Sequence, residues 1–72
     1  ILRILSEGDA YGYAIWKRLG RTITLGAVYQ HLSDLEERSL VTSFQRGGRR
    51  YFRLTEKGVR ALRALDELRD LL

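Results

Sequence analysis

The sequence predicts a small, mainly α-helical domain with one β-hairpin and a separate carboxy-terminal helix. Apolar residues recur at helical spacing in four segments, and two alternating runs flank the glycine pair at residues 47–48. The 72-residue chain contains no cysteine, which excludes a disulfide framework and thiolate metal sites. A chain of this length is one domain, near the smallest size at which a core is stable alone, so a second subunit would add stability.

Two short helices are expected first. Residues 1–6 have apolar side chains at helical spacing, and because Ile1 is not methionine we expect the chain to be trimmed from a longer one. A second helix is expected over residues 10–19. Asp9 would cap it by accepting from first-turn backbone N–H groups, and Gly20 would end it in a left-handed conformation.

A third helix is expected over residues 25–39, with Thr24 as its amino-terminal cap. Its core side carries Val28, Leu32 and Leu35. Gln30 and Ser33 point away from that side, and acidic residues follow only from Asp34 onward. This asymmetry favours approach of the amino-terminal half of the helix to DNA.

Residues 41–54 are predicted to form a β-hairpin with its two-residue turn at Gly47-Gly48, because both positions accept positive φ. The resulting register places Arg46 opposite Arg49, with a contact between Phe44 and Tyr51 on the outer face. The core face is predicted to carry Val41, Ser43, Phe52 and Leu54.

The whole excess of positive charge lies in this hairpin. The net charge is +4, and the hairpin carries Arg46, Arg49, Arg50 and Arg53. Arginines that face each other repel, whereas a phosphate near both would turn the repulsion into attraction. The sequence therefore indicates a polyanion as partner. The alternative is a solvated loop that is basic for solubility.

Thr55 is expected to cap a last helix, whose residues Val59 and Leu62 would reach back to the domain. Four further positions have coiled-coil spacing: Ala61, Leu65, Leu68 and Leu72. Because one small domain cannot cover this surface, we expect a homodimer with two-fold symmetry. The alternative is that the helix packs wholly on its own domain.

This order of elements is that of a winged helix-turn-helix, with a three-helix core, a two-stranded wing and a carboxy-terminal dimerisation helix. The sequence resembles the PadR-like family of transcriptional regulators in YGYAI (11–15), LGAVYQHLSDLEERSLV (25–41), GGRRYFRLTEKG (47–58) and the leucine-rich tail. The resemblance implies a dimeric repressor that binds a palindromic operator in double-stranded DNA, and in many members a small-molecule effector. Gln30 stands where the family often has proline, and Ser39 where it usually has glycine.

The predicted domains are a DNA-binding domain at residues 1–54 and a dimerisation helix at residues 55–72. Gln30 is the best candidate to read a base edge, because its amide pairs with adenine's donor and acceptor together. The other predicted DNA contacts are Tyr13, Lys17, Thr24, Tyr29, Ser33, Arg46, Arg49 and Arg50.

Some of these residues have simpler interpretations. Trp16 is expected in the core rather than as a platform for a ligand. Tyr29 could pack against the hairpin, and Gln30 could be an ordinary solvated position. His31 has only scattered carboxylates as partners, so we expect neither a metal nor a cofactor.

Enzymes are the function class that the sequence disfavours most, because no nucleophile and base lie at a suggestive spacing. A winged-helix protein-interaction module and a non-specific architectural DNA-binding protein stay open as alternatives. No segment has the roughly 20 apolar residues that cross a bilayer, so we expect a soluble protein. The lack of cysteine favours the cytoplasm, and the DNA-binding function that the resemblance implies would place the protein at the nucleoid.

Overall fold

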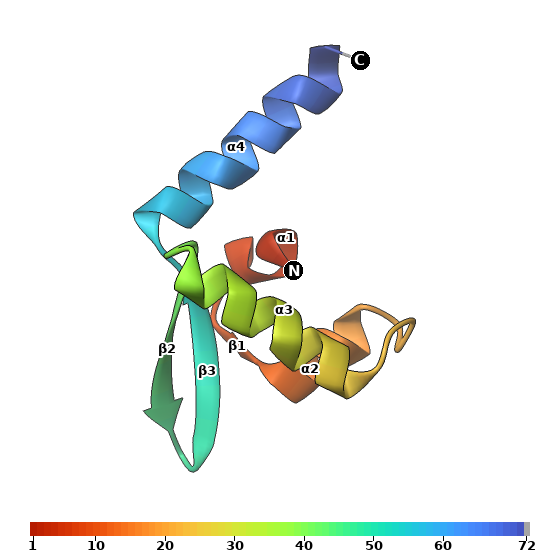
Figure 1. Ribbon diagram of the computed structural model, residues 1–72, viewed down its shortest axis with the longest axis vertical. Helices are drawn as coiled ribbons and strands as arrows, with labels where there is room; N and C mark the ends of the chain where they lie inside the picture. Colours follow the sequence, from red (N-terminus) through yellow and green to blue (C-terminus); the bar gives the residue numbers. More distant parts are fainter. Residues whose placement is uncertain (72) are drawn as a thin grey trace.

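The computed structural model describes residues 1–71 and contains, within them, four helices and a three-stranded antiparallel sheet (Figure 1). Leu72, predicted as part of the coiled-coil seam, lies outside the described residues. The predicted fold class is confirmed. The elements in chain order are α1 (Leu2–Ser6), β1 (Ala10–Tyr11), α2 (Gly12–Arg18), α3 (Leu25–Glu37), β2 (Val41–Arg46), β3 (Arg49–Leu54) and α4 (Glu56–Leu71).

The hairpin of β2 and β3 has the predicted register, from Val41 paired with Leu54 at its base to Arg46 paired with Arg49 at its tip. The turn residues Gly47-Gly48 have φ angles of 55° and 77°. Other residues are strained in this left-handed region, so the glycine pair determines where the chain turns.

Strand β1 extends the sheet beyond the predicted hairpin. It pairs with the free edge of β3, where Tyr11 lies opposite Tyr51. The prediction that Asp9 caps the second helix is wrong, because α2 begins without a side-chain cap. The carboxylate of Asp9 instead accepts two hydrogen bonds from Arg53, which lies far along the chain.

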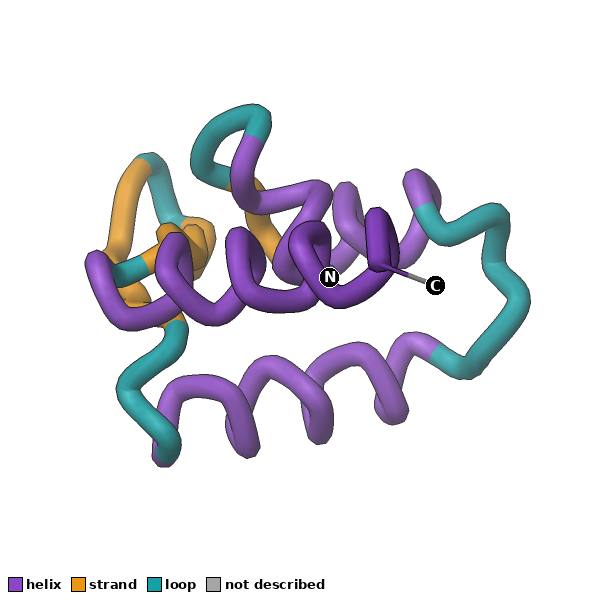
Figure 2. The backbone as a smooth tube through the Cα atoms, turned by 90° about the horizontal axis from the view of Figure 1, so that it is seen from above, coloured by secondary structure: helices purple, strands orange, loops and turns teal. Residues whose placement is uncertain are grey.

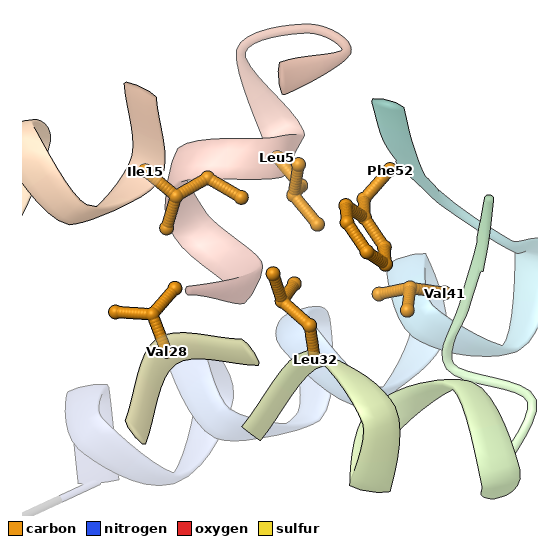
Figure 3. Packing of buried hydrophobic residues seen from close by; sticks show 6 residues of the cluster. All are labelled: Leu5, Ile15, Val28, Leu32, Val41 and Phe52. Carbon is orange, nitrogen blue, oxygen red and sulfur yellow. The ribbon is translucent and has the colours of Figure 1, made fainter. Parts of the chain in front are cut away.

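The core lies between the helices and the sheet (Figure 3). It consists of Leu5, Ile15, Val28, Leu32, Val41 and Phe52, none more than 4% exposed. Full burial of a side chain of this kind contributes about 1.5–3 kcal/mol. Because these residues come from α1, α2, α3 and both hairpin strands, the hairpin packs directly on the three-helix unit. Leu35 is half-buried at the edge of the cluster.

The ends of α2 and α3 depend on left-handed residues and one cap. Gly20 has a φ of 72°, as predicted, and Arg21 follows with a φ of 59°. Thr24 caps α3, because its hydroxyl accepts a hydrogen bond of 3.1 Å from the N–H of Ala27. The helix ends two residues earlier than expected, since Ser39 has a φ of 61°. Glycine adopts this left-handed conformation with less strain than serine does.

Helix α4 lies over α1 and runs away from the hairpin tip (Figures 1 and 2). Only Thr55 separates it from β3, and the Thr55 hydroxyl caps the helix as predicted. An ion pair between Arg3 and Asp66 joins α1 to α4. Leu62 is half-buried, and Val59 is 38% exposed, so the fold covers the Val59 side chain only in part.

Candidate nucleic-acid interface

The amino-terminal half of α3 presents small and polar groups to solvent. Thr24, Gln30 and Ser33 are all exposed, and no charged residue occurs in α3 before Asp34. Figure 2 shows α3 along one outer face of the molecule. The side-chain amide of Gln30 donates to Oδ1 of Asp34 at 3.2 Å. Because both groups are at the surface, this bond exchanges with water or with another partner at little cost.

Tyr29 packs against Gly12 at the start of α2. A Cβ atom at Gly12 would lie 2.5 Å from Cε1 of the Tyr29 ring, so only glycine leaves room for this packing. The residue is nevertheless 45% exposed. The close approach therefore holds the ring at the junction of α2 and α3 while part of it remains accessible.

The exposed side of α2 carries the predicted pair Tyr13 and Lys17. The ammonium nitrogen of Lys17 lies 5.8 Å from the centre of the Tyr13 ring. Trp16 is half-buried against the core, as expected, and its indole N–H donates to the carbonyl oxygen of Ile23 at 2.7 Å. That bond ties α2 to the turn before α3.

At the tip of the hairpin, Arg46 and Arg49 lie over aromatic rings. The guanidinium carbon of Arg46 is 5.1 Å from the centre of the Phe44 ring, and that of Arg49 is 4.7 Å from the centre of the Tyr11 ring. Within residues 1–71 neither arginine forms a salt bridge. Both are on the sheet face opposite to α3, by the alternation of the strand.

Two of the four hairpin arginines are paired with carboxylates of the same chain. Arg50 donates to Oε1 of Glu36 at 2.6 Å, and Arg53 donates to both carboxylate oxygens of Asp9 at 2.9 and 2.7 Å. The hydrogen bonds from Arg53, helped by its charge and that of Arg46, lower the pKa of Asp9 against the opposing effect of desolvation. The free positive charge of the hairpin is thus concentrated at its tip.

Sequence reasoning missed three residues that shape this surface. Glu36, Asp9 and Tyr11 each hold one of the hairpin arginines. Their partners are 14, 44 and 38 positions away in sequence, so local periodicity carries no signal for them. Arg21 is a fourth residue that sequence reasoning missed: it is exposed, and its guanidinium carbon lies 5.1 Å from the centre of the Trp16 ring.

The candidate surface combines these parts. In Figure 1 the tip of the hairpin and the amino-terminal end of α3 both lie in the half of the molecule away from the end of α4. Gln30, Ser33 and Thr24 lie on α3 or at its cap, Arg46 and Arg49 at the hairpin tip, and Tyr13 and Lys17 on α2. Arg50 is in its ion pair with Glu36 beside the far end of α3.

Other kinds of site have little support in the described part of the chain. Residues 1–71 contain no group of three or more His, Asp or Glu side chains that could hold a metal ion, and His31 is exposed. A shallow hollow near the amino terminus is lined by Ile1, Leu2, His31, Asp34, Leu35 and Arg38. None of the helices described here is both long enough and apolar enough to cross a membrane.

Comparison with known proteins relates this geometry to a family. A model of the "Transcriptional regulator PadR-like family" matches residues 1–64, which include the three-helix core, the hairpin and the first turns of α4. A crystal structure of a "Possible transcriptional regulator for arsenical resistance" is 32% identical, with a TM-score of 0.73, over 92% of this chain and 67% of that chain. No match is found among the curated proteins. The similarity therefore extends across both the helices and the hairpin of the candidate surface.

Proposed function

This chain belongs to the PadR-like family of transcriptional regulators, and on that premise we propose that it is a dimeric repressor that recognises a palindromic operator in double-stranded DNA. The family and the structural neighbour support a DNA-binding regulator. Sequence-specific reading, dimerisation and repression are what the proposal adds. The observation that carries it is an uncharged face of α3 combined with two arginines at the hairpin tip that have no carboxylate partner within residues 1–71.

In the proposed complex, the amino-terminal half of α3 enters the major groove. Gln30 exchanges its hydrogen bond with Asp34 for a base edge, most favourably an adenine. Ser33 is next to Gln30 on the same exposed side, and Tyr29 reaches the groove wall or a phosphate. The free N–H groups after Thr24 and the positive end of the helix dipole favour a phosphate there.

The hairpin acts as the wing of this complex. Arg46 and Arg49 contact phosphates or enter the adjacent minor groove, where a narrow A·T-rich stretch concentrates negative potential. Tyr13 and Lys17 provide further backbone contacts from α2. Arg50 contributes a phosphate contact only when it leaves its ion pair with Glu36.

Helix α4 provides the dimer contact, and residues 55–72 form the dimerisation segment beside the DNA-binding domain of residues 1–54. Leu65, Leu68 and Leu71 are 56%, 57% and 82% exposed, and Ala61 lies half-buried beside them. An apolar stripe of this kind needs a partner surface, and a second α4 offers the same stripe by symmetry. Two copies would bring two α3 helices to the two halves of a palindrome, where they would block transcription.

The test begins with selection of bound duplexes from a random pool, followed by fluorescence anisotropy of the selected and scrambled duplexes over a salt series. Gln30→Ala should remove about 1–3 kcal/mol of discrimination between the two duplexes. Arg49→Ala should weaken both alike and lower the salt slope by about one unit. Arg60→Ala on α4 is the matched control and should change neither.

The same measurements separate the alternatives. A non-specific architectural protein would bind selected and scrambled duplexes equally, and Gln30→Ala would leave that ratio unchanged. A protein-interaction module would show no duplex binding at low salt, which would contradict the proposal altogether.

A further inference from the structure

Three aromatic rings form a continuous row across the outer face of the sheet. Tyr11 on β1, Tyr51 on β3 and Phe44 on β2 are direct neighbours in the strand register. The rings of Tyr11 and Tyr51 meet edge-on with centres 5.5 Å apart, and those of Phe44 and Tyr51 stack at 5.8 Å. We call these three residues the aromatic row. It lies on the side of the sheet that faces away from the core.

The two arginines of the wing tip lie on opposite ends of the aromatic row. Arg46 lies over Phe44 and Tyr51, with its guanidinium carbon 5.1 and 5.6 Å from the two ring centres. Arg49 lies over Tyr11 at 4.7 Å. Like charges that face each other across a hairpin repel, and attraction to different rings draws these two apart.

A contact with the face of a ring leaves the hydrogen-bonding capacity of a guanidinium available. The group is planar and its N–H donors point outward in the plane, so a ring on its face leaves those donors exposed to solvent or to a phosphate. An arginine already held on a ring loses less side-chain freedom when it binds than one that moves freely. The aromatic row therefore holds the guanidinium groups of Arg46 and Arg49 in place for an anionic partner.

The other arginines of the hairpin are held differently, which singles out the tip pair. Arg53 also lies over Phe44, at 4.7 Å, but its Nε and Nη2 both donate to the carboxylate of Asp9. Arg50 is bound to Glu36. Among the hairpin arginines, only Arg46 and Arg49 lie over an aromatic ring and have no carboxylate partner within residues 1–71.

We infer that the aromatic row is a positioning platform that presents Arg46 and Arg49 to the phosphates of double-stranded DNA. Tyr11 affects DNA binding by orienting Arg49. Phe44, together with Tyr51, affects it by orienting Arg46. The aromatic residues raise DNA affinity without contacting the DNA. The inference rests on the proposed function and adds to it the residues that orient the phosphate-binding groups.

A double-mutant cycle between Tyr11 and Arg49 tests the platform, with a fluorescein-labelled mixed-sequence duplex at low salt as the probe. Tyr11→Leu should weaken binding by about two- to fivefold, the range expected for loss of one exposed cation–π contact. In the Arg49→Ala background the same change should have no effect, because the group it orients is gone. Tyr11→Phe keeps the ring and should retain wild-type affinity.

A second double-mutant cycle, between Tyr11 and Arg46, provides the matched control. The double variant Tyr11→Leu with Arg46→Ala should lose affinity by the product of the two single fold-changes, because Tyr11 is not the ring over which Arg46 lies. Thermal melting of every variant checks that the domain is folded. A Tyr11→Leu loss of equal size in the wild-type and Arg49→Ala backgrounds would overturn the positioning role while leaving DNA binding intact. Absence of any duplex binding by the wild-type chain would overturn both.

A measurement on the free protein keeps the inference testable if Tyr11→Leu does not fold. The side-chain protons of Arg49 should resonate upfield of their ordinary NMR positions, because they lie over the Tyr11 ring, and Tyr11→Phe should preserve that shift. Ordinary positions for these protons in the folded wild-type chain would overturn the platform directly.

Discussion

Glu36 of α3 is bound to Arg50 of β3, with Nη2 of the arginine 2.6 Å from Oε1 of the carboxylate. The other carboxylate oxygen of Glu36 accepts a hydrogen bond from the hydroxyl of Ser43 on β2, also at 2.6 Å. One side chain of α3 thus holds both strands of the hairpin. An exposed ion pair of this kind contributes only about 0–1 kcal/mol to stability, so its main effects are on the orientation of the hairpin and on its available charge.

Glu36→Gln should therefore change DNA binding more than stability. The substitution removes the charge that holds Arg50, and the released guanidinium gains access to phosphates. We expect the slope of log affinity against log salt to steepen by about one unit for mixed-sequence duplexes. Glu37→Gln is the matched control, because Glu37 is exposed, carries the same charge and makes no salt bridge within residues 1–71. Equal slopes for the two variants would show that Arg50 stays away from DNA.

Gly12→Ala should destabilise the fold by about 1–3 kcal/mol, the usual cost of overpacking. The added methyl group would lie 2.5 Å from the Tyr29 ring, so the ring must move. Chemical denaturation measures the loss. Gly26→Ala is the control, since its nearest neighbour would be 4.0 Å away, and we expect no loss or a gain of about 0.5–1 kcal/mol. A cost of Gly12→Ala that persists in the Tyr29→Ala background would contradict the proposed clash.

The Asp9–Arg53 pair should make stability depend on acid pH. Arg53 lowers the pKa of Asp9 in the folded state below the ordinary value of 3.8. A lowered folded-state pKa adds stability that is fully present above the ordinary value and is lost as the pH falls through the folded-state pKa. Melting temperatures recorded at pH values above and below 3.8 should fall more for the wild type than for Asp9→Asn.

The control for this pH dependence is Asp70→Asn, which removes an exposed carboxylate from α4. We expect its melting curve to fall with acid pH as steeply as that of the wild type. If Asp9→Asn also keeps the wild-type slope, the pair with Arg53 does not contribute to acid sensitivity.

Leu68→Asp should convert the proposed dimer into monomers. It places a charge in the exposed apolar stripe of α4, where burial against a second copy would then cost more than it gains. Sedimentation equilibrium measures the mass. Arg63→Asp introduces the same carboxylate away from the stripe and should keep the dimer mass. A monomeric mass for the unmodified chain would contradict the dimer.

The features that could be predicted are those set by neighbouring residues. The hairpin register follows from the alternation around Gly47-Gly48, and the caps at Thr24 and Thr55 follow from a hydroxyl placed just before an apolar repeat. Strand β1 could not be foreseen, because two residues have no readable period and take their conformation from the edge of β3.

The charge balance of the candidate site could not be predicted from the sequence. The cluster of arginines is visible in the sequence, yet the two carboxylates that bind Arg50 and Arg53 come from distant segments joined only in the folded chain. The prediction of Asp9 as a helix cap is wrong for the same reason: the sequence offers a local partner, whereas the partner in the folded chain is 44 residues away. The DNA contacts themselves stay predictions.

The junction at Thr55 connects α4 directly to β3. Only this residue lies between them, and it is bound to the connection between α3 and β2: its N–H donates to the carbonyl oxygen of Leu40 at 3.1 Å, and its hydroxyl donates to the carbonyl oxygen of Ser39 at 2.5 Å. In the proposed dimer, a change in the angle between the two α4 helices would therefore swing each hairpin and each α3 together. That angle would then set the distance between the two operator halves that the dimer binds. A change in the stiffness or tilt of the α4 pair would change which distances between the halves are accepted.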